Sequence, residues 1–292
     1  MIFFDENDNS IVWMITERCN SNCIMCPMSA DTRKRGKGYT DNNPAILLSE
    51  LPSDITHIDI TGGEPFLNWK KALDVMKNIN IHFPQTPVLV LTNGRALSLS
   101  FLQKEIQALI TAQYRFAIPL HAPNAMLHDK ITQSCGSFEQ TIDALHFLSG
   151  TKAEVEIRIV GSRVNAKKIT DLCEYIIDDN IKVDTVNLIG MEMNGQAARN
   201  RKQLWIDYDQ LYTMAEPGLI SLVENGIDVG LYGFPLCALP KRAWAIAKHG
   251  IATEKIRYYD ACDRCIEKKA CGGLFKSTYL LGIYQVKPFE KE

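Results

Sequence analysis

Three cysteines near the start of the chain have the type and spacing for metal chemistry. Cys19, Cys23 and Cys26 form a C-x3-C-x2-C run. Closely spaced thiolates on one loop can wrap a compact iron–sulfur cube, and three ligands for four irons leave one iron open to a cofactor or substrate. The alternative is a zinc knuckle, which normally needs four ligands, so His57 or His121 would have to supply the fourth. The spacing favours a [4Fe–4S] cube and leaves zinc open.

A second group of cysteines lies near the other end of the chain, with the spacing C-x24-C-x2-C-x5-C: Cys237, Cys262, Cys265 and Cys271. Four thiolates can close a site completely, which suits one iron–sulfur cluster or a tetrahedral zinc ion. The other two cysteines are isolated. Cys173 shares a helix face with apolar neighbours and is expected in the core, whereas Cys135 lies in a Ser/Gly loop and is expected to be a free thiol.

Composition narrows the class of protein. The chain has 292 residues, 46% hydrophobic, enough for one large core or a barrel with a small appendage. A net charge of -2 argues against a nucleic-acid-binding face. The first ten residues are acidic and lack the basic start of a signal peptide, and no apolar run approaches the ~20 residues that span a bilayer. We therefore expect a cytoplasmic protein without a membrane segment, whose nine cysteines serve metal sites rather than disulfides.

Strand-like and helix-like runs alternate along most of the chain. The expected strands are short and apolar, as in parallel strands buried on both faces: 11–16, 56–61, 88–92, 115–120, 155–160 and 185–189. The expected helices between them are 45–51, 69–80, 100–110, 138–148 and 166–178, with Ser137 and Gln140 as a capping box. Such a series predicts an α/β fold with right-handed crossovers. Six units are too few for eight-fold closure, so a partial (β/α)6 TIM barrel is expected first and a doubly wound sheet second. A longer helix, 208–224, and a strand, 228–232, follow.

Three motifs fall at the carboxyl ends of these strands, where α/β enzymes place their chemistry. The cysteine loop follows the first strand. The run Gly62-Gly63-Glu64-Pro65 follows the second, and Asn93 in a Thr-Asn-Gly turn follows the third. Glycines there allow close approach of the backbone to a ligand.

Together these motifs resemble the radical S-adenosylmethionine (SAM) superfamily. The resemblance implies that the open iron binds SAM and that a 5′-deoxyadenosyl radical abstracts a substrate hydrogen, with Cys19, Cys23 and Cys26 as catalytic cluster ligands. It also implies that the Gly-Gly-Glu turn binds SAM, with Glu64 accepting from the ammonium group. Met25 stands where the superfamily often has an aromatic residue near the adenine, a space that a flexible thioether can fill.

Three further residues are candidates for the same site. Arg158 in the fifth strand needs an anion if it is buried, either the SAM carboxylate or a salt bridge to Glu64 or Glu156. Met191, after the sixth strand, could border the adenine or pack in the core. His121 is at the catalytic edge, where ordinary hydrogen bonding is the simpler interpretation, as it is for His128.

The tail resembles the auxiliary-cluster module called SPASM and its shortened form, Twitch. A full SPASM module has a further cysteine where this chain has Phe275. The resemblance therefore implies one auxiliary [4Fe–4S] cluster, with zinc as the alternative. We expect two domains, a radical SAM partial barrel at 1–230 and a small C-terminal iron–sulfur module at 231–292.

Several stretches are also similar to HxsC-type maturases of the His-Xaa-Ser system, among them the runs 118–123, 136–138, 155–160, 187–192 and 271–275. That resemblance implies post-translational modification of a ribosomally made peptide, a second radical SAM protein as partner and an external electron donor. An open barrel has a free strand edge, and peptides often bind such edges, so the peptide is expected beside the first or sixth strand. The alternatives are a radical SAM enzyme acting on a small molecule, such as a purine-derived precursor, and a non-catalytic zinc-binding adaptor.

Overall fold

A nine-stranded sheet organises the computed structural model, which describes residues 1–6, 8–39, 43–179, 181–249 and 255–290. Its strands lie side by side in chain order. They are β1 (Ile2–Asp5), β2 (Ser10–Met14), β3 (His57–Thr61), β4 (Val88–Leu91), β5 (Tyr114–Pro119), β6 (Glu154–Val160), β7 (Thr185–Ile189), β8 (Asp228–Tyr232) and β9 (Ala247–Lys248). β1 runs antiparallel to β2, and every later pair is parallel.

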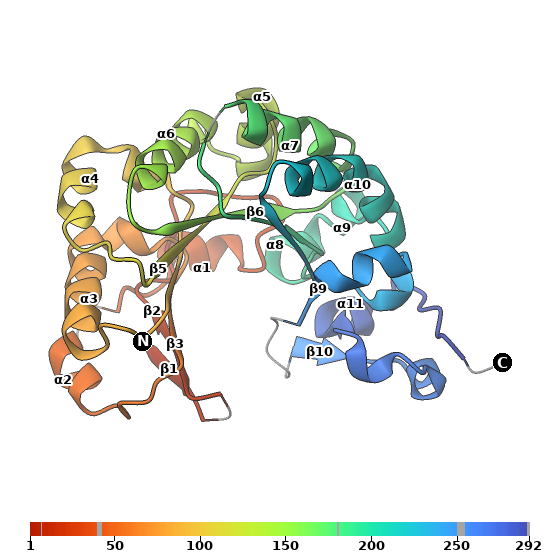
Figure 1. Cartoon of the computed structure of the whole chain (residues 1–292), viewed down its shortest axis with the longest axis horizontal. Coiled ribbons are helices and arrows are strands. Elements are labelled where there is room, and N and C mark those ends of the chain that lie inside the picture. The colour runs from red at the N-terminus through yellow and green to blue at the C-terminus, as the bar shows by residue number, and fades with distance from the viewer. Residues whose placement is uncertain (7, 40–42, 180, 250–254, 291–292) are drawn as a thin grey trace.

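The α-helices in chain order are α1 (Ala30–Arg35), α2 (Pro44–Ser49), α3 (Trp69–His82), α4 (Ser100–Gln107), α5 (Ala125–Thr132), α6 (Ser137–Ser149), α7 (Ile169–Asp178), α8 (Gly195–Arg199), α9 (Arg201–Leu204), α10 (Tyr208–Glu224) and α11 (Lys276–Leu281). The longer helices between the strands, α3, α4, α6, α7 and α10, form the outside of an arch whose inner side is the sheet (Figure 1). Within the described ranges β1 and β9 do not pair, so the arch stays open. The expected α/β fold with an open, mostly parallel sheet is confirmed.

The two faces of the sheet differ in chemistry, most clearly in β6. Val155, Ile157 and Ile159 are buried in one core with the outer helices. The alternate residues Glu156 and Arg158 face the inside of the arch, where they line a cavity. The expectation of apolar strands buried on both faces is therefore wrong for this strand. It alternates because one face packs on helices and the other faces an interior space.

The sheet has more strands than the seven expected. β8 continues the parallel series beside β7, β9 follows it, and β1 folds back along β2 as a hairpin partner. The edges expected to receive a peptide, at β2 and β7, are consequently already paired with the chain's own strands. That part of the sequence-based prediction is wrong, because β1 pairs with β2 and β8 pairs with β7.

The capping box expected at Ser137 and Gln140 is also absent. α6 begins after Gly136, whose φ is 74°, and no side chain of that cap bonds the helix. Asp129 of α5 supplies the cap instead, accepting from the Gly136 and Phe138 amides at 2.6 and 2.9 Å and from Ser137 Oγ at 2.8 Å. A carboxylate near a helix N-terminus satisfies free amide groups there.

The tail forms a smaller unit beside the end of the sheet (Figure 1). It contains a two-stranded antiparallel sheet of β10 (Ile256–Arg257) and β11 (Leu274–Phe275), followed by α11. A 3-10 helix over Lys241–Ile246 leads into β9. The boundary expected at residue 230 falls inside β8. No helix in the described parts of the chain has the length and apolar character needed to cross a bilayer.

Candidate functional site

The three N-terminal cysteines line one cavity of about 350 Å³ at the carboxyl end of the sheet. They lie on the loop that leaves β2. The turns after β3 and β4 contribute Gly62, Gly63 and Asn93 to the same cavity. The structure thus brings together the three strand-end motifs that the sequence placed at this edge.

The cysteine loop is held by side chains from elsewhere in the chain, among them Arg33, Asn93, Arg95 and Asn200. Arg33 of α1 is buried and donates to the Ser21 carbonyl at 3.2 Å and to Asn22 Oδ1 at 2.8 Å. Asn93 Nδ2 lies 2.7 Å from Asn20 Oδ1 and 3.7 Å from the Cys19 sulfur. Sequence reasoning missed Arg33, since no local pattern reveals that a basic residue on a short helix turns back to the loop before it.

The Gly-Gly turn packs against the backbone of that same loop. The Gly63 amide donates to the Thr16 carbonyl at 2.7 Å, and the Glu64 amide donates to the Arg18 carbonyl at 2.8 Å. A Cβ on Gly63 would lie 2.3 Å from the Arg18 carbonyl oxygen and 2.4 Å from that of Glu17. Gly63 must therefore be glycine for chain-to-chain contact, a reason additional to the expected approach of a ligand.

Glu64 is completely buried beneath the turn and does not line the cavity. Its carboxylate accepts from Thr92 Oγ1 at 2.7 Å and from the amides of Asn93 and Phe66 at 2.7 and 3.0 Å. Burial raises its pKa, and these hydrogen bonds oppose the rise. Glu64 thereby ties the turn after β3 to the turn after β4, and Pro65 begins the 3-10 helix next to it.

The two methionines proposed near the adenine have different surroundings. Met25 lines the cavity, although only 5% of its surface is exposed. Met191 is buried in a small apolar cluster together with Met25, Met193 and Ile131, and it is not among the residues that line the cavity. Met191 therefore packs in the same apolar cluster as Met25.

Arg158 is paired with Glu156, one of the two salt bridges considered from the sequence. Its Nε donates to Glu156 Oε1 at 2.6 Å. Arg158 and His121 both line the cavity. Burial lowers the pKa of His121 to about 3, so its imidazole is neutral at physiological pH. His128, on α5, is held neutral in the same way, and its Nδ1 accepts from the His121 amide at 3.2 Å.

The four tail cysteines line a single second cavity. Backbone amides point at two of their sulfurs: those of Leu236 and Gly273 donate to Cys271, and that of Phe289 donates to Cys265, each at 3.4 Å. Amide groups directed at sulfur are typical of iron–sulfur sites, where they tune the cluster. Of the isolated cysteines, Cys173 is fully buried as expected, and Cys135 is exposed.

Neither cysteine group forms a preorganised site for a single ion. Within the described chain, which includes every cysteine and histidine, no three Cys, His, Asp or Glu side chains converge closely enough to hold one. Burial raises the pKa of Cys23 to about 12, so its thiolate form needs a cationic partner at the sulfur.

An open parallel sheet with a cysteine loop and a glycine turn at its carboxyl edge defines an α/β enzyme built around a metal-cluster site. The model of the family "Radical SAM superfamily" matches residues 13–187, more than half of the chain. The protein belongs to the radical SAM superfamily, and membership implies a [4Fe–4S] cluster and SAM as cofactors.

Curated relatives are similar over part of their length. An AdoMet-dependent heme synthase of Oleidesulfovibrio alaskensis is 26% identical over 172 residues, covering 57% of this chain and 42% of the relative. A probable dual-specificity RNA methyltransferase RlmN of Prochlorococcus marinus is 32% identical over 135 residues, 41% of this chain and 37% of the relative. The chain thus spans less than half the length of these two relatives.

Solved structures share the fold. SuiB of Streptococcus suis superposes with a TM-score of 0.62 at 13% identity, covering 87% of this chain and 54% of SuiB. The enzyme anSMEcpe with bound AdoMet gives a TM-score of 0.57 at 16% identity, covering 75% and 62%. At this identity the likeness establishes the architecture alone.

Proposed function

We propose that this radical SAM enzyme carries out the post-translational modification of a ribosomally made peptide. The observation that carries the proposal is the open arch, whose inner side is hollow and charged rather than filled by apolar side chains. Two structural neighbours are known with peptides, SuiB bound to precursor peptide SuiA and anSMEcpe bound to the Kp18Cys peptide. The resemblance to HxsC-type maturases supports the same class of substrate.

The residues of the site would divide the work. Cys19, Cys23 and Cys26 would hold the catalytic [4Fe–4S] cluster, which with SAM supplies the electron transfer and radical that start the reaction. Asn93 and Arg33 hold the loop that presents these thiolates.

SAM itself would be bound by the two strand-end turns and the strand beyond them. Gly62, Gly63 and Asn93 would offer backbone and amide groups to SAM, while Glu64 positions their turns from beneath. Met25 would border the adenine. The terminal nitrogens of Arg158 suit the SAM carboxylate.

The tail would hold one auxiliary [4Fe–4S] cluster on Cys237, Cys262, Cys265 and Cys271. Four ligands leave such a cluster without an open iron, so its role would be electron transfer and stabilisation of the tail rather than substrate binding. An external electron donor and a second radical SAM protein of the same system would be the partners.

A small-molecule substrate is the second candidate, because curated relatives include an AdoMet-dependent heme synthase and a probable GTP 3′,8-cyclase. The deciding experiment incubates reconstituted enzyme, SAM and reductant with a His-Xaa-Ser-type peptide encoded beside the gene. Mass spectrometry is expected to show a shifted peptide mass together with 5′-deoxyadenosine or a methyl-transfer product. If only small metabolites raise SAM cleavage above background, the peptide proposal fails and the superfamily assignment stands.

A further inference from the structure

A third cavity, of about 860 Å³, lies inside the arch at the amino-terminal ends of the strands. Its acidic and basic lining residues come from β3, β5 and β6: His57, Asp59, Arg115, Glu154, Glu156 and Arg158. Arg158 also lines the cavity of the cysteine loop. The two cavities therefore share that residue. We call the cavity of the cysteine loop the upper cavity and the cavity inside the arch the lower cavity.

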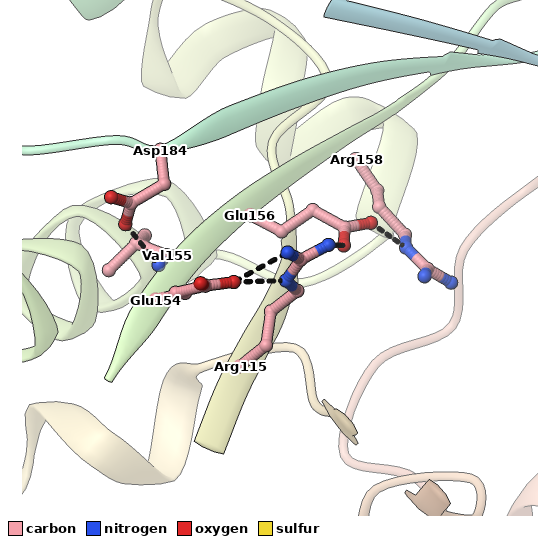
Figure 2. Close-up of polar contacts among 6 residues, drawn as sticks. All are labelled: Arg115, Glu154, Val155, Glu156, Arg158 and Asp184. Carbon is pink, nitrogen blue, oxygen red and sulfur yellow. Dashed lines mark hydrogen bonds and ion pairs between the residues drawn. The ribbon is translucent and has the colours of Figure 1, made fainter. Parts of the chain in front are cut away.

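Most of the charges in the lower cavity neutralise one another (Figure 2). Arg115 donates through Nε to Glu154 at 2.7 Å, and its Nη1 lies 3.8 Å from the buried carboxylate of Glu156. Glu156 also accepts from Arg158 Nε at 2.6 Å. The terminal nitrogens of Arg158 point away from Glu156 in Figure 2. These four residues pair two guanidinium groups with two carboxylates.

Asp59 is the carboxylate left over. It faces the same cavity from β3, and in the described parts of the chain no hydrogen bond or ion pair engages its carboxylate. Burial raises its pKa, an effect that the nearby His57 and Arg158 oppose. A half-buried carboxylate without a partner is costly unless a ligand provides the matching charge. Three carboxyl groups in the cavity thus face two guanidinium groups, and Asp59 is the carboxyl group without a partner.

His121 provides an independent indication of a ligand at the other end. Only 3% of its surface is exposed, it lines the upper cavity, and its Nδ1 is enclosed without a partner. Within the described residues neither ring nitrogen makes a hydrogen bond to the protein. Nearly all buried polar groups in native proteins have a partner. Because Nδ1 is enclosed, Nε2 is the ring nitrogen that is available to a group entering the cavity.

The spacing along β3 connects the two ends. Asp59 and Thr61 are two residues apart and face the same side of the sheet, and Thr61 lines the upper cavity. Two residues of a strand span about 6.6 Å, roughly the length of an extended lysine side chain. If the cationic group of a substrate side chain paired with Asp59, the rest of that side chain would extend along β3 to the upper cavity.

We propose that the lower cavity binds a cationic side chain of the peptide substrate, of the lysine or arginine kind, with Asp59 as its counter-ion and His121 as a hydrogen-bond partner nearer the cysteine loop. The inference rests on the proposed function and names the substrate chemistry of that same site. A positive charge would restore neutrality among the residues that line the cavity.

The test measures binding of three host peptides, N-acetyl-Gly-Gly-X-Gly-Gly-amide with X as lysine, glutamine or glutamate, to anaerobically reconstituted enzyme with SAM. Calorimetry is expected to show the lysine peptide binding most tightly. Asp59→Asn should weaken that peptide about tenfold to a hundredfold, the loss of one charge-assisted hydrogen bond, without weakening the glutamine peptide. Asp74→Asn is the matched control, because it removes the same charge from the outer surface of α3, where Asp74 pairs with Lys71.

Equal affinities for the three peptides in the unaltered enzyme would overturn the proposal, and so would the absence of saturable binding of the lysine peptide. An equal loss in Asp59→Asn and Asp74→Asn would also overturn it. SAM cleavage, measured on the same preparations after a reductant is added, separates this outcome from the proposed function. Cleavage without lysine preference refutes the Asp59 site alone, whereas lysine preference without any SAM cleavage refutes the enzymatic proposal and leaves the binding site.

Discussion

Replacing Gly63 with alanine tests whether the glycine turn supports the cysteine loop. The added methyl group would meet two carbonyl oxygens, those of Arg18 and Glu17, at 2.3 and 2.4 Å. Backbone atoms cannot move aside as a flexible side chain would. The loop and the turn must therefore separate, which strains or breaks the amide bonds from Gly63 to Thr16 and from Glu64 to Arg18.

The magnitude follows from these contacts. Overpacking costs about 1–3 kcal/mol, and two weakened hydrogen bonds cost about 0.5–1.5 kcal/mol each. We expect Gly63→Ala to lower the free energy of unfolding by about 2–6 kcal/mol, a large part of a typical 5–15 kcal/mol. Because the displaced segment leads directly to Cys19, iron content and SAM affinity should fall as well.

The assay is anaerobic urea unfolding, with iron analysis and SAM calorimetry on the same protein. Gly150→Ala is the control, since that glycine at the end of α6 has φ of -86° and a Cβ there would meet only the Phe147 carbonyl, at 3.5 Å. If Gly63→Ala is as stable as the control and keeps its iron and SAM affinity, the role assigned to this contact is refuted.

Three further predictions concern other parts of the molecule. Glu64→Gln leaves one carbonyl oxygen to accept from three donors. The free energy of unfolding should therefore fall by about 1–3 kcal/mol, and calorimetry should show weaker SAM binding. Unchanged values would mean that neither turn depends on Glu64. His121 and His128 stay neutral when folded, with pKa values of about 3 and 4 instead of 6.5, so the unfolded chain gains protons first and stability is lost as pH falls from about 6.5 towards 4. Each should cost about 2 kcal/mol at about pH 5, and His128→Gln should flatten this dependence in urea titrations. Cys262→Ala should remove about half of the iron, and full iron retention would argue against a tail cluster.

Much of the fold is readable from the sequence because local patterns determine it. Apolar runs rich in Val and Ile mark the parallel strands, and the helix expected at 208–224 has the bounds of α10, Tyr208–Glu224. The short edge strands β1 and β9 escape such reasoning. They are held by long-range pairing rather than by a pattern of their own.

The loops that form the candidate site can be predicted from the sequence, but the hydrogen bonds and ion pairs between them cannot. The cysteine spacing and the glycine turn identify which loops meet, since strand ends of a parallel sheet share one edge. The buried role of Glu64 depends on Thr92, 28 positions away. Likewise, the alternation of charges in β6 matters only once Arg115 of the neighbouring strand lies beside it.

The central claim is that this chain cleaves SAM at a cluster on Cys19, Cys23 and Cys26. The most direct measurement compares the anaerobically reconstituted protein with its triple Cys→Ala variant, for iron content and, after incubation with SAM and a reductant, for 5′-deoxyadenosine by mass spectrometry. We expect about eight irons and SAM cleavage in the unaltered protein, and about half the iron with no cleavage in the variant. Stoichiometric zinc with no iron after reconstitution, or SAM cleavage that survives loss of all three cysteines, would contradict the account.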